Sequence, residues 1–111
     1  MSTANAGFPE FPNPRYVKLE SILARAYLQA TEGKGKERHA FGENYEDQKV
    51  CQINRWLRSP DGALYQAIKK AIESKRLPPE RAVAELLGAI NYLAAAVLLI
   101  EEFATEQPGP A

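Results

Sequence analysis

The segment from Gly33 to His39 holds the densest set of chemically capable side chains in the sequence. It reads Gly-Lys-Gly-Lys-Glu-Arg-His, so it combines two glycines and three cations with the only histidine of the chain. Glycine lets the backbone approach a ligand closely, and lysine and arginine donate charge-assisted hydrogen bonds to phosphate. The sequence therefore predicts an anion-binding turn in which Lys34, Lys36, Arg38 and His39 bind the ligand. A solvated turn without a ligand is the alternative.

This segment is not a P-loop. The glycines before its lysines have the wrong spacing, no serine or threonine follows, and no strand is expected before it. Tyr45 and Trp56 are the candidates for stacking on a base, and an arm with Phe8 and Phe11 could close the site from a neighbouring subunit. The pattern favours capture of a nucleotide, or of another phosphorylated small ligand, without catalysis or a cofactor.

Acidic residues after this segment indicate a different chemistry. Glu43 and Glu46 are three residues apart, so on a helix they share a face and could hold Mg²⁺, which prefers oxygen ligands. All-helical, metal-dependent nucleotide pyrophosphohydrolases pair such an E-x-x-E motif with a second acidic pair on a later helix. Here the later helix offers Glu85, but Gly88 stands where the last carboxylate would be. Acids that oppose a helix dipole are the favoured explanation of Glu43 and Glu46, and the metal site is the alternative.

The overall charge argues against nucleic acid as a partner. Lys plus Arg and Asp plus Glu number 14 each, so any preference for anions must be local. A catalytic triad is excluded, because the chain has one histidine and no recognisable serine or cysteine elbow. The single cysteine, Cys51, lies in a helical apolar pattern, which predicts a buried thiol in a reducing compartment.

The elements that must position these residues are all helical. Apolar residues recur at three- and four-residue spacing, which predicts an all-α fold: a small bundle of about four helices with a long apolar C-terminal helix. We expect an extended, proline-rich N-terminal arm over 1–13, a helical domain over 14–104 and a disordered tail over 105–111. Helix starts and stops place the helices at 14–32, about 44–57, 60–74 and 79 to about 103.

Each of the first three helices is expected to turn its apolar residues to a common core, and the third to show Lys69, Lys70 and Lys75 to solvent. The predicted core residues are Tyr16, Leu19, Leu23, Ala26, Tyr27 and Ala30, then Val50, Ile53, Trp56 and Leu57, then Leu64, Ala67, Ile68, Ala71 and Ile72.

The last helix carries two apolar stripes, which three shorter helices would cover poorly. We therefore expect a homo-oligomer through residues 80–103, with small residues allowing close approach and Asn91 bonding across a two-fold axis. The alternative is a monomeric bundle in which Gly88 makes room for Trp56 or Tyr65. The large stripe is Val83, Leu86, Ile90, Leu93, Val97 and Ile100, and the small one is Ala84, Gly88, Asn91 and Ala95.

Neither end of the chain predicts a membrane protein. The strongest apolar run, Leu86 to Ile100, is shorter than the roughly 18 residues needed to span a bilayer, and it contains Asn91 and Tyr92. The short polar start, Met1 to Gly7, lacks the features of a secretory signal. We expect a buried helix and a cytoplasmic protein.

Three stretches carry a resemblance to known proteins: Gly33 to Gln48, Gly62 to Lys70 and Glu85 to Tyr92. Over roughly the central two-thirds of the chain they resemble small helical proteins of bacteriophages and prophages. They are also similar to the N-terminal domain of phage dATP/dGTP diphosphohydrolases, which has a glycine-rich basic segment, a middle helix and a closing apolar helix in this order.

That resemblance implies binding more than hydrolysis. The diphosphohydrolase family carries histidines and acids on its two later helices, whereas this chain has Lys69 and Lys70 in one region and Gly88 and Asn91 in the other. Small helical phage proteins also include sponges that sequester nucleotide signals of the host, and inhibitors that bind a host defence protein. A sponge, a divergent Mg²⁺-dependent diphosphohydrolase and a protein-binding inhibitor are the three hypotheses.

Overall fold

The computed structural model of the chain describes residues 13–32 and 44–106, and over these residues the fold is all-α. The predicted small bundle with a long C-terminal helix is confirmed. The predicted arm, apart from Asn13, lies outside the described residues. The elements are α1 (Val17–Glu32), the short 3₁₀ helix η2 (Tyr45–Asp47), α3 (Lys49–Leu57), α4 (Asp61–Ser74) and α5 (Pro79–Glu106).

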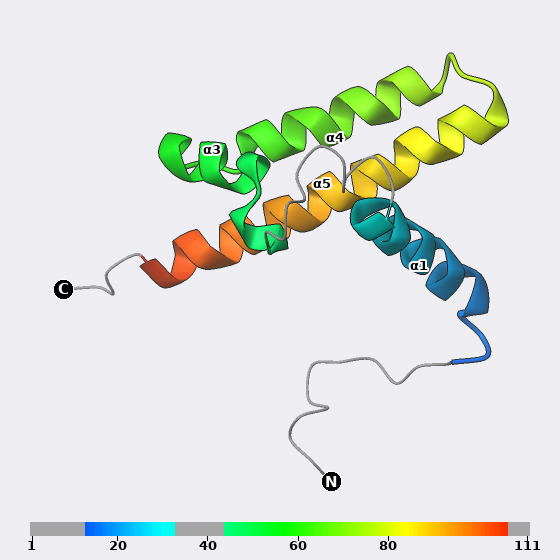
Figure 1. Cartoon of the computed structure of the whole chain (residues 1–111), viewed down its shortest axis with the longest axis horizontal. Coiled ribbons are helices and arrows are strands. Elements are labelled where there is room, and N and C mark those ends of the chain that lie inside the picture. The colour runs from blue at the N-terminus through cyan, green and yellow to red at the C-terminus, as the bar shows by residue number, and fades with distance from the viewer. Residues whose placement is uncertain (1–12, 33–43, 107–111) are drawn as a thin grey trace, which may run out of the picture.

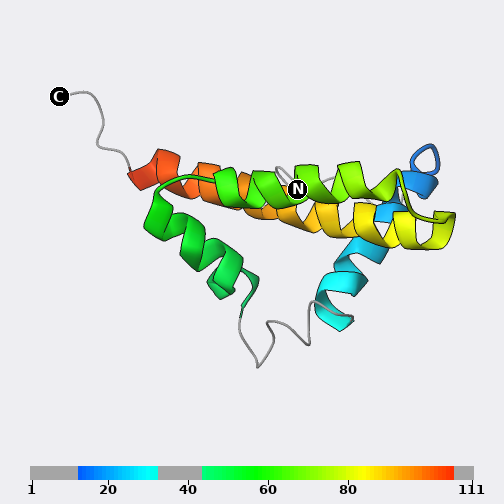
Figure 2. The ribbon, with the colours of Figure 1, turned by 90° about the horizontal axis from the view of Figure 1, so that it is seen from above.

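The helices α4 and α5 form an antiparallel hairpin to which the other helices attach (Figure 1). α1 crosses α5, while α3 contacts both α4 and the C-terminal part of α5. Seen from above, α3 and the end of α1 project from the same side of the hairpin (Figure 2). Two helix termini that precede and follow the cationic segment therefore lie on one side of the molecule.

Three helix boundaries differ from the expected ones. The first helix was expected to begin at Pro14, but α1 begins three residues later, at Val17, because the side chain and backbone of Asn13 accept hydrogen bonds within a turn. The expected second helix is divided, because the extended backbone of Gln48 (φ −68°, ψ 160°) separates η2 from α3. At the C-terminus α5 continues to Glu106, two residues into the segment expected to be a tail.

Asn54 fixes the corner between α3 and α4. Its side chain is 2% exposed, and its Nδ2 donates to the Val50 carbonyl at 2.6 Å. Its Oδ1 accepts from the Gly62 N–H at 2.9 Å. A Cβ at Gly62 would lie only 2.8 Å from that Oδ1, so this position accommodates no side chain without displacing Asn54. Arg58 ends α3 in the left-handed conformation (φ 56°), which turns the chain directly toward α4.

Small side chains form the contact between α4 and α5. Four alanines are at most 4% exposed, and they let the two helices pack closely. Cys51 is fully buried beside them, as predicted. In the described part of the chain, Leu87 and Leu99 are the only large aliphatic side chains that are buried. The four alanines are Ala63 and Ala67 of α4 with Ala95 and Ala96 of α5.

The predicted core of the first three helices is largely wrong. Ala26 is the one buried residue of α1, and Lys70, expected in solvent, lies half-buried against α5. The physical reason is that the helices meet through their small-residue faces, which allow close approach and turn the larger faces outward. The exposed residues are Tyr16, just before α1, then Leu19, Leu23 and Tyr27 of α1, Ile53, Trp56 and Leu57 of α3, and Ile68, Ala71 and Ile72 of α4.

The small stripe of α5 packs within the same chain. Asn91 was expected to bond across a two-fold axis, but its Nδ2 donates to the Ala26 carbonyl of α1 at 2.9 Å. Gln29 of α1 likewise donates to the Ala84 carbonyl at 3.0 Å. The part of this stripe from Ala84 to Asn91 is therefore the surface on which α1 docks.

Gly88 makes room for α4 and α1. A Cβ there would lie 3.2 Å from Lys70 Cδ and 3.4 Å from Gln29 Oε1. The expected neighbours, Trp56 and Tyr65, are exposed instead. Because Gly88 has no side chain, the aliphatic part of the Lys70 side chain lies against α5 there, and its ammonium group pairs with Glu85.

The large stripe of α5 is left open. Five of its six residues are 41–56% exposed, and Ile90 is half-buried. By length and composition α5 is able to cross a bilayer, a property shared by core helices of soluble proteins, and 28% of its apolar window is buried. The run from Leu86 to Ile100 was expected to be too short to span a bilayer, but α5 contains an apolar window of 18 residues. We call this surface the α5 stripe (Val83, Leu86, Ile90, Leu93, Val97 and Ile100).

Candidate functional site

The residues that are predicted to bind phosphate belong to the connection between α1 and η2. Lys34, Lys36, Arg38 and His39 are outside the described residues, as is Glu43. Their contact with a ligand stays a prediction. What the structure does describe is the surroundings: the two aromatic candidates and the remaining acids.

Tyr45 attaches η2 to α5. Its hydroxyl donates to the Asn91 carbonyl, and its ring packs on the buried cluster around Cys51 and Ala95. Burial raises the pKa of Tyr45 to about 12, so the phenol is neutral at physiological pH. These contacts give Tyr45 a structural role, and a base that stacked on its ring would have to compete with α5.

Trp56 is the more accessible aromatic candidate. Its side chain is 81% exposed on the outer face of α3. Two arginines anchor that helix: Arg55 forms a two-pronged pair with Glu102 at 2.7 and 2.9 Å, and Arg58 pairs with Glu106 at 3.0 Å. The hydrogen bonds from Arg55 hold the pKa of the Glu102 carboxyl below its usual value. Trp56 is therefore a solvent-accessible ring on an element fixed to α5.

The acids of the alternative metal site have separate environments. Glu46 is exposed on η2, whereas Glu85 is half-buried on α5 and pairs with Lys70 at 3.6 Å. Over residues 13–32 and 44–106, no group of three or more His, Cys, Asp or Glu side chains could hold a metal ion. A site made of Glu43, Glu46 and Glu85 would need the Glu85 carboxylate to leave Lys70.

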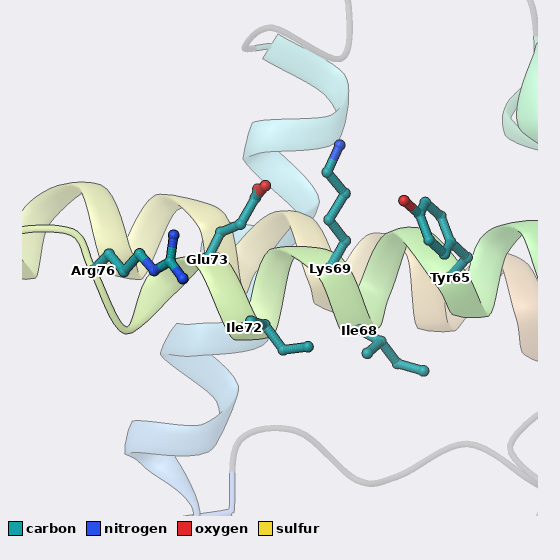
Figure 3. Close-up of a pocket in the computed structure, with 6 residues that line it drawn as sticks. All are labelled: Tyr65, Ile68, Lys69, Ile72, Glu73 and Arg76. Carbon is teal, nitrogen blue, oxygen red and sulfur yellow. The ribbon is translucent and has the colours of Figure 1, made fainter.

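Sequence reasoning missed an apolar surface on α4. A shallow pocket lies along this helix; five of its lining residues belong to α4 and the sixth, Arg76, to the turn that follows, so no second helix closes it (Figure 3). Ile68 and Ile72 were interpreted as core residues, and their i, i+3, i+7 spacing with Tyr65 on one face of the helix was not recognised. We call this surface the α4 face; it consists of Tyr65, Ile68, Lys69, Ile72, Glu73 and Arg76.

No family model, curated protein or solved structure matches this chain. The resemblance to small phage proteins and to the phage diphosphohydrolase domain therefore stays a prediction from the three stretches in which it was found.

Proposed function

We propose that this chain is a non-enzymatic binding protein of phage origin that captures a nucleotide or another phosphorylated small ligand. Lys34, Lys36, Arg38 and His39 bind the phosphates, and Trp56 stacks on the base. The observation that carries the proposal is the exposure of Trp56 on an anchored helix. A large aromatic ring in water on a rigid element is typical of a surface that a ligand covers.

In the regions where the diphosphohydrolase family has acids and histidines, this chain has residues that hold helices together, which supports capture without turnover. In this chain Lys70 pairs with Glu85, and Asn91 bonds to the backbone of α1. These side chains hold helices together, so they are occupied with packing. Such a protein would act in the host cytoplasm as a sponge that lowers the free concentration of a nucleotide defence signal.

Intrinsic fluorescence tests the proposal directly, because Trp56 is the only tryptophan. We expect saturable quenching on titration with mono-, cyclic or oligonucleotides, since a base that stacks on the indole changes its environment. The joint variant Lys34→Ala, Lys36→Ala, Arg38→Ala should lose saturable binding in calorimetry. Its matched control removes two exposed cations of the pocket on α4 and the turn after it, Lys69→Ala and Arg76→Ala, and should bind like the wild type.

The same titrations can also contradict the proposal. No saturable response to any nucleotide class, or equal loss of binding in the control, would overturn the proposal. Release of pyrophosphate from a nucleotide in the presence of Mg²⁺, abolished by Glu46→Ala, would replace capture with hydrolysis.

The α4 face favours a second candidate function, inhibition of a host defence protein by direct binding. Its three apolar side chains are each more than half exposed and are bordered by Lys69, Glu73 and Arg76. Apolar surface bordered by charge is typical of protein interfaces. Capture of one host protein by the wild type, lost with Ile68→Glu and retained with Lys18→Glu on α1, would support it.

A further inference from the structure

The described helices bury too little large apolar surface for a stable domain of this size. Their fully buried cluster is made of alanines, Cys51 and Leu99, while five residues of the α5 stripe are about half exposed. Small domains are marginal even with a full hydrophobic core. A contiguous aliphatic stripe along the longest helix is the kind of surface that monomers rarely expose. The α5 stripe therefore requires a cover for folding itself.

A cover that folding requires must be present wherever the chain is made. A second copy of the chain meets this condition at fixed stoichiometry, whereas a host protein or a ligand does not. Most soluble oligomers are homo-oligomers, and the two-fold dimer is the commonest arrangement. The question is then whether the α5 stripe is complementary to itself.

The spacing of the α5 stripe has this property. Its six residues follow one another at steps of 3, 4, 3, 4 and 3, which is the same series in both directions and repeats every seven residues. We infer that α5 packs antiparallel on α5 of a second copy, about a two-fold axis between Ile90 and Leu93. This arrangement places Val83 against Ile100, Leu86 against Val97 and Ile90 against Leu93, so that each valine, with three side-chain carbons, faces a leucine or isoleucine with four.

Small neighbours allow the two helices to approach. Ala94, which is exposed, lies on one edge of the stripe, and the partly exposed Ala82 lies on the other edge, where Ala89 and Ala96 are already buried within the chain. Side chains of this size let one backbone lie close to the other, so the aliphatic residues of each copy reach between those of its neighbour.

Charge at the two ends supports the antiparallel direction. Glu101 is exposed at the acidic end of α5 and forms no ion pair with another residue that the structure describes. The turn before α5 carries the exposed cations Lys75 and Arg76. Antiparallel packing puts Glu101 near this turn of the second copy, and it also opposes the two helix dipoles. Parallel packing would place like charges side by side.

This inference specifies the face, direction and register of the expected homo-oligomer, and it does not depend on the proposed ligand. Light scattering after size exclusion tests it: we expect twice the chain mass of 12.3 kDa. Leu93→Glu should reduce the particle to the chain mass or abolish folding, because a carboxylate would be buried in the seam. The control Ile68→Glu changes a similarly exposed aliphatic residue of the α4 face and should keep the dimer mass.

A disulfide experiment tests direction without disrupting the fold, in a Cys51→Ala background. In the antiparallel pair, Val83 of one copy lies beside Ile100 of the other, and the two Val83 positions are roughly 25 Å apart. A mixture of Val83→Cys chains and Ile100→Cys chains should therefore cross-link on oxidation, and Val83→Cys chains alone should not.

Three results would overturn the inference. One is a folded wild type at the chain mass, including a monomer whose stripe is covered by its own residues 1–12. Another is a dimer that survives Leu93→Glu but not Ile68→Glu, or Val83→Cys chains that cross-link with one another. The last is a wild type that is obtained only in lipid or detergent, which would make α5 a membrane helix.

Discussion

At Gly62 the fit of one methyl group decides whether the corner between α3 and α4 forms. Gly62→Ala would place a Cβ 2.8 Å from Asn54 Oδ1, and both hydrogen bonds of that buried amide would be disturbed. The cost of unsatisfied buried polar groups, about 2 kcal/mol, exceeds the gain of about 1 kcal/mol in helix propensity. We expect a clear loss of stability in urea denaturation.

Gly88→Ala is the matched control, since it adds the same methyl group to a helix. The nearest atoms there belong to the stem of Lys70, which can shift by a few tenths of an ångström. Stability should stay unchanged or rise by up to about 1 kcal/mol. If Gly62→Ala and Gly88→Ala lower the free energy of unfolding equally, packing around Asn54 is not the cause of the loss.

The pair between Arg55 and Glu102 predicts an acid dependence of stability. Because the pKa of Glu102 is lowered in the folded state, the stabilisation is complete above the ordinary carboxyl pKa of 4.5 and is lost as pH falls through the lower, folded value. The side chains are partly exposed, so the effect is at most about 1 kcal/mol. Thermal unfolding measured between pH 6 and 3 tests this, because the range covers the titration of the Glu102 carboxyl.

Glu102→Gln supplies the comparison for this titration. It should lower stability near neutral pH and converge with the wild type at acid pH, where the carboxylate is protonated in both states. Parallel curves for the two proteins would show that another group dominates the acid transition.

At the scale of elements, α1 depends on a few contacts with α5. Asn91 donates to the Ala26 carbonyl and Gln29 donates to the Ala84 carbonyl, while Ala26 is the only buried residue of α1. Asn91→Ala should cost about 1 kcal/mol and, more specifically, loosen α1. Hydrogen exchange should accelerate over Val17–Glu32 and stay slow in α4.

Gln52→Ala is the control for this measurement, because it also removes one bond from a side-chain amide to a backbone carbonyl, that of Asp47. It should leave exchange in α1 unchanged. Equal acceleration after both substitutions would mean that α1 is not held by Asn91.

Helix ends were more predictable from the sequence than helix faces. Ser59 accepts from the Asp61 N–H, and prolines precede or begin α4 and α5, because capping and proline restrictions act locally. Which face of a helix is covered depends on its partner helices. α5 has an apolar face on each side, so its own pattern did not determine that the small side meets α1 and α4.

The candidate site was predictable in composition only. Spacing identified the cationic segment and the aromatic candidates, but it could not distinguish Tyr45, whose hydroxyl bonds to α5, from Trp56, which is exposed. The difference arises from a contact between residues 46 positions apart. The same applies to Glu85, whose partner Lys70 lies on another helix.

At the scale of the whole molecule, a dimer that must form in order to fold has a stability that depends on concentration. A hundred-fold increase in protein concentration should stabilise the folded dimer by roughly 2.7 kcal/mol, through mass action alone. Thermal unfolding at two concentrations measures this shift. An unfolding temperature independent of concentration is expected only of a monomer.

The contact between α1 and α5 joins residues that are far apart in the sequence, and this separation affects the order of folding. α4 and α5 are joined by a short turn, so their contacts close a small loop, whereas Ala26 and Asn91 are 65 residues apart. Loop closure and topology favour the nearer pairing first. The hairpin should therefore be structured in the transition state while α1 is still unfolded, so substitutions at Ala63 slow folding and substitutions at Ala26 mainly accelerate unfolding.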